Sequence, residues 1–363
     1  MTCKKSRRFV MIKRFHGGSQ NKNLTDFSAP SNPLGAPKIA KKILENCIKN
    51  RSYERYPSYN KLRNYLSNYF NINKDFIIPI NGSDEALSLI PILFRPKNLI
   101  IIEPNFGDHK ILSNAIRSKL IRITLDIENK NYIDTEKIIK IIKSLKGSSL
   151  LIFSRPNNPI GFCLKINDIN EIIDNLDKDV NIIIDEAFIE ISDCDPLKPS
   201  EEYILLRSQT KTFSTPGFRL GEIISLNYKF IEKIESSIQA WPIDAITNCF
   251  YSKILKNKEF IKNYIDNANK TIKKERQFIE NSLNKELKVY NSRTAFLLIK
   301  HEIMPNPLFK KELIKKGIYI RDASTFYGLN KNYSRISIRL HGDNIKLIDA
   351  INGVLNEKDK KVP

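Results

Sequence analysis

The chain has 363 residues, of which 41% are hydrophobic and 28% charged, and its formal net charge is +20. This composition is typical of a globular protein with two or three domains, and no apolar run approaches the roughly 18 residues that a membrane span needs. The lysines are spread along stretches that also contain Glu and Asp, without an aromatic–basic module, which favours attraction of anionic substrates over nucleic-acid binding.

Cysteine usage and the N-terminus bear on the cellular compartment. The five cysteines are scattered, odd in number, and form neither a Cys-x-x-Cys motif nor a cluster with histidines. This pattern predicts a reducing, cytoplasmic environment, without disulfides and without a bound metal. Residues 1–14 are basic but lack the apolar core of a secretory signal, so we expect a short extension ahead of the first functional element.

The N-terminal part of the chain begins with small and polar residues. His16 precedes two glycines, and an imidazole beside bare backbone N–H groups can bind an anion, although a disordered arm is the alternative. Apolar residues at helical spacing predict amphipathic helices over residues 38–50 and 61–70. Tyr56 lies between these helices in an Arg-Tyr-Pro segment, where a packed surface tyrosine would be unremarkable in itself.

A glycine-containing segment after the next strand is a candidate phosphate site. Residues 77–80 are predicted to form a short strand, after which Asn-Gly-Ser-Asp-Glu opens a helix. Gly82 leaves backbone N–H groups accessible, Ser83 and Asp84 are residue types that cap helices, and helix N-termini bind phosphate. Caps of this kind are common, so the segment becomes informative in combination with other residues.

Strands and helices alternate through the middle of the chain. Apolar, β-branched runs predict strands at residues 98–102, 119–125, 149–153, 180–184 and 203–207. Amphipathic spacing predicts helices between them at 134–145 and 166–176. Repeated strand–helix units are typical of an α/β protein in which a mostly parallel sheet lies between two helical layers, a three-layer α-β-α sandwich.

Polar side chains follow two of these strands. Asn158 lies in a Pro/Asn/Gly-rich turn after strand 149–153, and Asp185 ends the apolar run of strand 180–184. Ligands of open α/β sheets bind at this carboxyl edge. An amide there can reach a ring oxygen, and a carboxylate can protonate and hold a pyridine nitrogen, so that the ring withdraws electrons.

Residues 208–221 contain the most specific pattern. Lys211 stands among small hydroxyl residues, and Arg219 follows across a Pro-Gly turn. A lysine that bonds covalently to an aldehyde needs a lowered pKa, which burial or neighbouring cations supply. The hydroxyl of Ser208 and the guanidinium of Arg219 can bind a phosphate. An ordinary loop with a solvated lysine is the alternative for this segment taken alone.

Asn158, Asp185 and Lys211, in this order and each following a strand, resemble the fold-type I pyridoxal-phosphate enzymes of the aminotransferase class I/II family. The resemblance extends from about His16 to the last helix. It implies pyridoxal 5′-phosphate as cofactor, with Lys211 and Asp185 as catalytic residues. The cofactor-binding residues that it implies are Tyr56, Ser83, Asp84, His109, Asn158, Asp185, Ser208, Lys211 and Arg219.

Two of these positions carry further implications. The family usually has tyrosine where this chain has His109, which can also stack on the cofactor ring; a surface histidine is the alternative. The tyrosine that corresponds to Tyr56 reaches across a dimer interface to the cofactor phosphate in related enzymes. The resemblance therefore implies a homodimer with shared active sites.

The resemblance also divides the chain. Residues 1–45 would form an N-terminal arm belonging to the small domain and the substrate site, residues 46–255 the large cofactor-binding domain, and residues 256–363 a smaller α/β domain. The pattern agrees, because the sequence becomes helical from residue 228 and then predicts further strands. The helices expected here cover 244–255 and 260–283, and the strands 288–300, 318–321 and 333–339.

Within the family, the resemblance is strongest to threonine-phosphate decarboxylases, which are related to histidinol-phosphate aminotransferases. It lies in His16-Gly17-Gly18, Asp26-Phe27-Ser28, Asn32-Pro33-Leu34-Gly35, Glu54-Arg55-Tyr56-Pro57, Phe188 and Ala240-Trp241-Pro242. His16 and Gly17 would contact the phosphate of a phosphorylated amino-acid substrate, Arg321 would assist them, and Arg335 would bind the α-carboxylate. Asn32 and Asn158 would also contact the substrate.

The expected reaction is decarboxylation of O-phospho-L-threonine to (R)-1-aminopropan-2-yl phosphate for cobalamin biosynthesis. The alternative is an aminotransferase that acts on histidinol phosphate or a related substrate with 2-oxoglutarate. Phe188 argues mildly against it, because that branch usually has a tyrosine hydroxyl there. A DNA-binding regulator on the same fold is disfavoured, because it would need an added helix-turn-helix segment and the stretch before His16 is too short to form one. Solvated strand ends are the alternative for Arg321 and Arg335.

Overall fold

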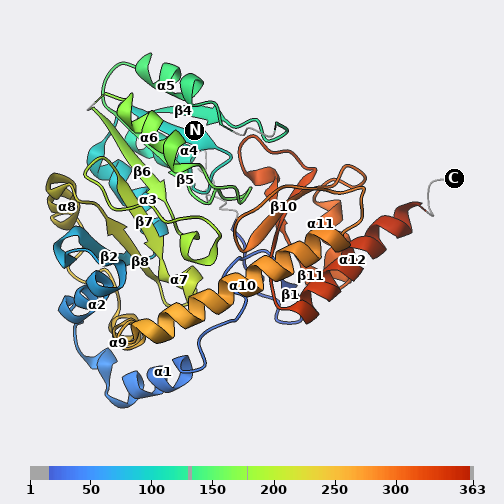
Figure 1. Cartoon of the computed structure of the whole chain (residues 1–363), viewed down its shortest axis with the longest axis horizontal. Helices are drawn as coiled ribbons and strands as arrows, with labels where there is room; N and C mark the ends of the chain where they lie inside the picture. Colours follow the sequence, from blue (N-terminus) through green and yellow to red (C-terminus); the bar gives the residue numbers. More distant parts are fainter. Residues whose placement is uncertain (1–15, 130–132, 178, 360–363) are drawn as a thin grey trace, which may run out of the picture.

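The computed structural model describes residues 16–129, 133–177 and 179–359, so Cys3 and the basic extension over residues 1–14 lie outside it. The described chain forms two α/β bodies (Figure 1). The large body contains the strands β2 to β8, and the small body contains β9 to β13 together with β1. The long helix α10 (Lys258–Ser282) runs from one body to the other.

The large body is built on a twisted, mostly parallel sheet. Among the described residues its strand order is β2-β8-β7-β6-β5-β3-β4. Strands β3 to β7 are parallel to one another, whereas β8 is antiparallel to both β7 and β2. The strands are β2 (Ile77–Asn81), β3 (Asn98–Glu103), β4 (Lys119–Thr124), β5 (Ser149–Ser154), β6 (Val180–Asp185), β7 (Ile204–Ser208) and β8 (Leu220–Ile224).

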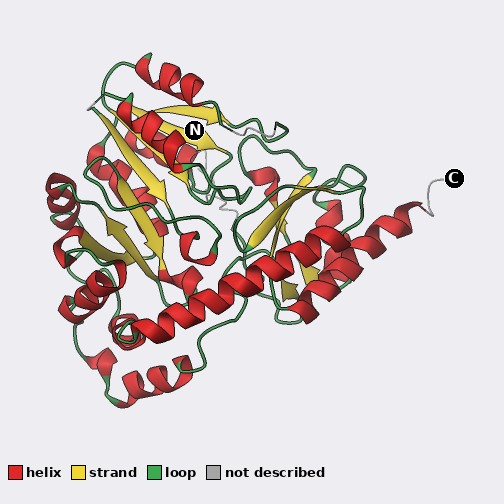
Figure 2. Cartoon of the chain, viewed as in Figure 1, coloured by secondary structure: helices red, strands yellow, loops and turns green. Residues whose placement is uncertain are grey.

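Helices cover both faces of this sheet, which makes the predicted α-β-α sandwich (Figure 2). Leu99 and Ile101 of β3 pack with α3 (Ser83–Phe94), α4 (His109–Ile116) and α8 (Tyr228–Glu235). Ile100 and Ile102 face the opposite side. Alternate residues of a strand point to opposite faces, so a strand covered on both sides is apolar throughout. The second layer contains α1 (Ala40–Lys49), α2 (Asn60–Phe70), α5 (Thr135–Lys143), α6 (Ile166–Asp174) and α9 (Ala245–Ile254).

The small body has its own core and takes in part of the N-terminal arm. Its antiparallel sheet has the order β12-β13-β10-β9 in the described chain, and β1 pairs in parallel with β11 beside it. The divisions at residues 45 and 255 stay predictions. The elements are β1 (Thr25–Asp26), β9 (Lys288–Val289), β10 (Phe296–Lys300), α11 (Leu308–Lys315), β11 (Ile318–Tyr319), β12 (Arg321–Asp322), β13 (Tyr333–Ser337) and α12 (His341–Asp359).

Two disulfides overturn the expectation that the cysteines are unpaired. Cys47 of α1 is bonded to Cys249 of α9, and Cys163 is bonded to Cys194. Their partners are 202 and 31 residues apart in sequence, so neither spacing nor an odd count could reveal pairs that the fold brings together. The argument for a reducing compartment therefore loses its basis. No helix among the described residues is long and apolar enough to span a bilayer.

Candidate active site

Lys211 lies where β7 passes into the short helix α7 (Gln209–Thr212), at the carboxyl edge of the sheet. Its Nζ is 5.5 Å from the centre of the Phe188 ring, and its carbonyl oxygen accepts a hydrogen bond from the N–H of Asn32 (3.0 Å). Burial, helped by the charges of Arg335 and Arg219, lowers the pKa of Lys211 to about 8. A far larger fraction of this amine than of a free lysine is therefore uncharged near neutral pH, which favours a nucleophilic lysine.

Asp185 ends β6, and the residue is 8% exposed. Its Oδ1 accepts a hydrogen bond from the N–H of Ala187 (3.0 Å). Burial, with a smaller contribution from the charge of Asp84, raises the pKa of Asp185 to about 7. A buried carboxyl of this kind is stabilised as the anion once a cationic partner arrives, and a protonated pyridine nitrogen is such a partner.

Asn158 and Arg335 meet between the two bodies. Nη1 of Arg335, on β13, donates to Oδ1 of Asn158 (2.5 Å), and Nη2 donates to the carbonyl oxygen of Ser28 (2.7 Å). The Nε of Arg335 is buried and has no hydrogen-bond partner among the described residues. Buried polar groups are normally paired, so a donor left over at this position suits an incoming carboxylate.

A candidate phosphate cradle lies at the N-terminus of α3. A Cβ added to Gly82 would come within 2.5 Å of Nη2 of Arg219, and one added to Gly221 within 2.4 Å of the backbone nitrogen of Ser83. The hydroxyls of Ser208 and Thr210 are 2.8 Å apart nearby, just ahead of Lys211. Bare glycines thus let a guanidinium and a helix N-terminus approach one another, which is the arrangement that binds phosphate.

His109 begins α4 and is neutral. Its Nε2 lies 2.9 Å from the carbonyl oxygen of Phe106. Because a carbonyl can only accept, Nε2 carries the proton in this tautomer. Burial lowers the pKa of His109 to about 4. The imidazole would therefore offer a cofactor ring an uncharged face throughout the physiological pH range.

A cavity of about 570 Å³ opens next to His109, between the two bodies. His16 and Arg321 both line it. Nη2 of Arg321 donates to Thr325 Oγ1 (2.7 Å), and Nε2 of His16 is 3.9 Å from Asp108 Oδ2. A cationic guanidinium and an imidazole on one cavity suit a second anionic group, separate from the position of Arg335.

Comparison with known proteins identifies the family. Residues 22–351 match the family described as aminotransferase class I and II. The chain belongs to this family. It uses pyridoxal 5′-phosphate, the cofactor of these enzymes, and the buried carboxyl of Asp185, the lowered pKa of Lys211 and the phosphate cradle fit that molecule.

The curated relatives have two kinds of name. The chain is 29% identical to a putative threonine-phosphate decarboxylase of Caldanaerobacter subterraneus, covering 90% of this chain and 89% of that protein. It is 30% identical to a histidinol-phosphate aminotransferase of Clostridium novyi, with 87% of each covered. It is also 29% identical to the adenosylcobalamin biosynthesis bifunctional protein CobDQ of Leptospira interrogans, covering 93% of this chain but 39% of that longer protein.

The solved structures agree on the fold. The histidinol-phosphate aminotransferase of Clostridium acetobutylicum superposes with a TM-score of 0.80 at 28% identity, over 91% of this chain and 99% of that one. Family membership and fold are thus settled, whereas the relatives divide between a decarboxylase and an aminotransferase at similar identity.

Of the remaining expected site residues of this aminotransferase-family chain, Asn32 lies beside Lys211, whereas Tyr56 lies at the surface. Tyr56 is 77% exposed and stacks on Trp241, with ring centres 4.0 Å apart. The side chain of Asn32 is hydrogen-bonded within the protein. Its Nδ2 donates to the carbonyl oxygen of Thr212 (2.9 Å), and its Oδ1 accepts from the N–H of Leu34 (3.0 Å). Arg321 begins β12, where the sequence pattern placed it at the end of a strand. Gly17 packs on Ser28, whose carbonyl oxygen would be 2.2 Å from a Cβ.

Sequence reasoning missed an arginine–carboxylate pair in the cavity. Arg122 of β4 lies over the ring of Tyr327 (4.1 Å to its centre), and its Nε is 3.4 Å from Glu103 Oε1. Burial raises the pKa of Glu103 to about 7. A usable signal existed, because Glu103 ends an apolar strand in the same way as Asp185.

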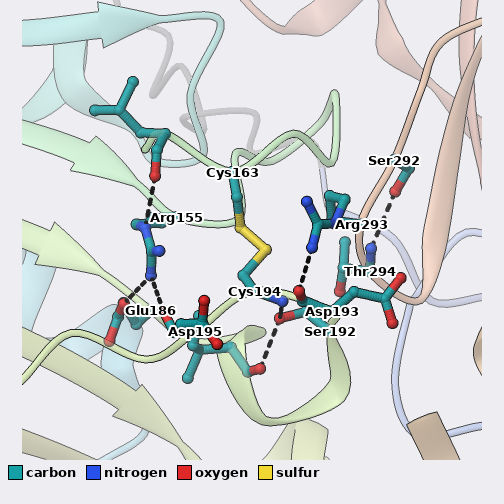
Figure 3. The surroundings of a disulfide bond; sticks show 12 residues. Arg155, Cys163, Glu186, Ser192, Asp193, Cys194, Asp195, Ser292, Arg293 and Thr294 are labelled. Carbon is teal, nitrogen blue, oxygen red and sulfur yellow. Dashed lines mark hydrogen bonds and ion pairs between the residues drawn. A yellow bond between two sulfur atoms is a disulfide. The ribbon is translucent and has the colours of Figure 1, made fainter. Parts of the chain in front are cut away.

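Hydrogen bonds and a disulfide join the loops after β5 and β6, which contain residues of the candidate site (Figure 3). Nη1 of Arg155 donates to Glu186 Oε1 (2.9 Å) and to the carbonyl oxygen of Asp195 (2.6 Å). The Cys163–Cys194 disulfide joins the same loops. Side chains on rigid, cross-linked loops lose little entropy when a ligand binds, which favours a pre-formed site.

Proposed function

We propose that this enzyme decarboxylates O-phospho-L-threonine to (R)-1-aminopropan-2-yl phosphate, as expected of a step in cobalamin biosynthesis. The observation that carries the proposal is the presence of two separate cationic positions. Arg335 stands beside Asn158 and lowers the pKa of Lys211, whereas Arg321 and His16 line the adjoining cavity. A substrate with an α-carboxylate and a distal phosphate matches both.

Different residues of the proposed site would bind the cofactor, bind the substrate and transfer the proton. Bound pyridoxal phosphate supplies an electron sink for the bond that breaks at Cα. Asp185 would hold the ring nitrogen in its protonated form, and His109 would lie against the ring. Arg335 and Arg321 would fix the two anions of the substrate, and their placement would decide whether the bond from Cα to the carboxylate or the bond from Cα to hydrogen breaks. After CO2 has left, Lys211, with its pKa of about 8, would deliver the proton that Cα requires.

Transamination of histidinol phosphate remains the second candidate, because relatives of that name are equally similar. One observation favours decarboxylation: Phe188 has no hydroxyl to bond a ring oxygen. Phe188 instead packs edge-on against Phe296, with ring centres 5.1 Å apart. Arg335 does not separate the two reactions, because 2-oxoglutarate also has an α-carboxylate.

We also propose a homodimer with shared active sites. Tyr56 is too exposed to serve the site of its own chain, yet it is held by the stack on Trp241. An ordered, exposed aromatic pair is typical of a protein interface. A second copy could therefore receive the Tyr56 hydroxyl at its phosphate cradle.

The deciding experiment is turnover in the absence of a keto acid. Purified protein with pyridoxal phosphate is incubated with O-phospho-L-threonine, and released CO2 and the amino phosphate are measured. We expect both products in equal amounts. If product forms from histidinol phosphate when 2-oxoglutarate is supplied, and no CO2 is released from O-phosphothreonine, the aminotransferase assignment replaces the decarboxylase.

A further inference from the structure

Glu128 connects the two bodies at a point away from the cofactor residues. It lies in the loop between β4 and α5, on the large body. All the donors that surround its carboxylate in the described structure come from the small body: Tyr290, Tyr333, Lys288 and Lys300. We call Glu128 and these four residues the interdomain clasp.

The contacts of the clasp are short and charge-assisted. The hydroxyls of Tyr290 and Tyr333 both donate to Glu128 Oε1, at 2.7 and 2.8 Å. Lys288 donates to Oε2, and Nζ of Lys300 is 3.4 Å from Oε1. Together they lower the pKa of Glu128 to about 2, led by Lys288 and Tyr290, although its side chain is 47% exposed. The carboxylate is therefore ionised at every pH at which the enzyme would be assayed.

One residue of the interdomain clasp, Tyr333, lies on β13, the strand that also contains Arg335. Tyr333 and Arg335 are two residues apart on β13, so both side chains project from the same face of that strand. Tyr333 contacts the large body through Glu128, and Arg335 contacts it through Asn158. When a carboxylate engages Arg335, the Glu128 contacts remain to keep β13 in place.

We propose that Glu128 is a positioning residue, which docks β13 on the large body and so holds Arg335 at the distance from Lys211 that the substrate requires. This inference rests on the proposed function for its kinetic consequence. A carboxylate that fixes the position of another residue should alter substrate binding while leaving the cofactor residues of the large body untouched.

The test compares Glu128→Gln with Glu136→Gln, an exposed carboxylate in the first turn of α5 on the same body. Glutamine keeps the size of the side chain and removes its charge. For Glu128→Gln we expect a KM for O-phospho-L-threonine raised about five- to tenfold, with kcat and the visible absorbance of the bound cofactor unchanged. Hydrogen exchange of β9 and β13 in the holoenzyme should also become several-fold faster. Glu136→Gln should change neither.

Tyr333→Phe gives an independent check, because it removes the hydroxyl on the other side of the contact. Its effect on KM should be in the same direction but smaller, because Glu128 keeps Tyr290, Lys288 and Lys300. The two changes share one contact, so the double variant should raise KM by less than the product of the two single effects. If the wild-type enzyme turns the substrate over, and Glu128→Gln changes neither KM nor the rate of hydrogen exchange, the positioning role of Glu128 is wrong. A wild type that releases no CO2 would instead overturn the proposed function, and the exchange rates would still test the clasp.

Discussion

Arg335 and Asn158 join the two bodies at the active site, because Nη1 of Arg335 donates to Asn158 Oδ1 over 2.5 Å. The arginine comes from β13 and the asparagine from the loop after β5, which are 177 residues apart in sequence. One contact thus couples the position of the guanidinium proposed to bind the substrate to a residue expected at the cofactor ring. Changes to either side chain should alter substrate binding and cofactor electronics together.

Arg335→Lys should weaken substrate binding while leaving cofactor uptake intact. Lysine keeps the charge but lacks the planar pair of N–H groups that a carboxylate binds. We expect KM for O-phospho-L-threonine to rise about tenfold or more, and further in Arg335→Ala, measured by steady-state CO2 release. Arg339→Ala is the matched control, since Arg339 lies beyond the end of β13 and pairs with Asp343. An equal rise in both variants would contradict the role of Arg335.

Gly82→Ala should weaken cofactor binding. The new methyl group would displace the guanidinium of Arg219, and Gly82 has a φ of +77°, which residues with a Cβ adopt with strain. A hydrogen bond to a charged group contributes about 1.5–3 kcal/mol, so the dissociation constant for pyridoxal phosphate should rise about tenfold or more. Titration of the visible absorbance measures it. Gly217→Ala, where a Cβ meets nothing within 4 Å, should bind normally; equal affinities would argue against the cradle.

Glu222→Gln should stabilise the apoprotein more at pH 8 than at pH 5. Glu222 is fully buried on β8, and burial raises its pKa to about 8. The folded state therefore binds more protons than the unfolded state between pH 4.5 and 8, so this group costs stability as pH rises through that window. The difference in melting temperature between variant and wild type should grow by a few degrees from pH 5 to pH 8. An equal difference in melting temperature at pH 5 and pH 8 would refute the raised pKa of Glu222.

Mixed dimers test the role of Tyr56. Lys211→Ala and Tyr56→Ala subunits are each expected to have little activity alone. In a mixed dimer, one site combines an intact Lys211 with an intact Tyr56 from the other copy, so equal mixing after subunit exchange should restore about a quarter of wild-type activity. Analytical ultracentrifugation would confirm that dimers form. Activity that stays at the level of the separate variants would show that the sites are not shared.

The strands that end at the candidate active site can be predicted from the sequence, because a run of apolar residues is enough to indicate a buried strand. Apolar runs such as Ile182–Ile184 can be buried on both faces only in a covered sheet, and the polar residue that ends such a run must lie at the edge. The sequence alone therefore places Asn158, Asp185 and Lys211 at that edge. The exception is β8, whose Leu-Gly-Glu-Ile-Ile sequence contains a glycine and a buried glutamate that interrupt the apolar pattern.

The remaining features depend on which segments dock against one another. Cys47 and Cys249 approach because α1 packs on α9, and Glu128 meets Tyr333 because the small body lies against the β4–α5 loop. No local pattern encodes such pairs, since each partner is an ordinary residue in its own segment. The neutral state of His109 likewise follows from burial, which its position after a strand does not reveal.

The most direct test of the active site is to locate the lysine that carries the cofactor. The holoenzyme is treated with borohydride and digested, and mass spectrometry finds the residue bearing the reduced pyridoxyl group. We expect the label on Lys211, and its loss together with the visible absorbance in Lys211→Ala. A label on a different lysine, or a protein that takes up no pyridoxal phosphate, would contradict the assignment of the site.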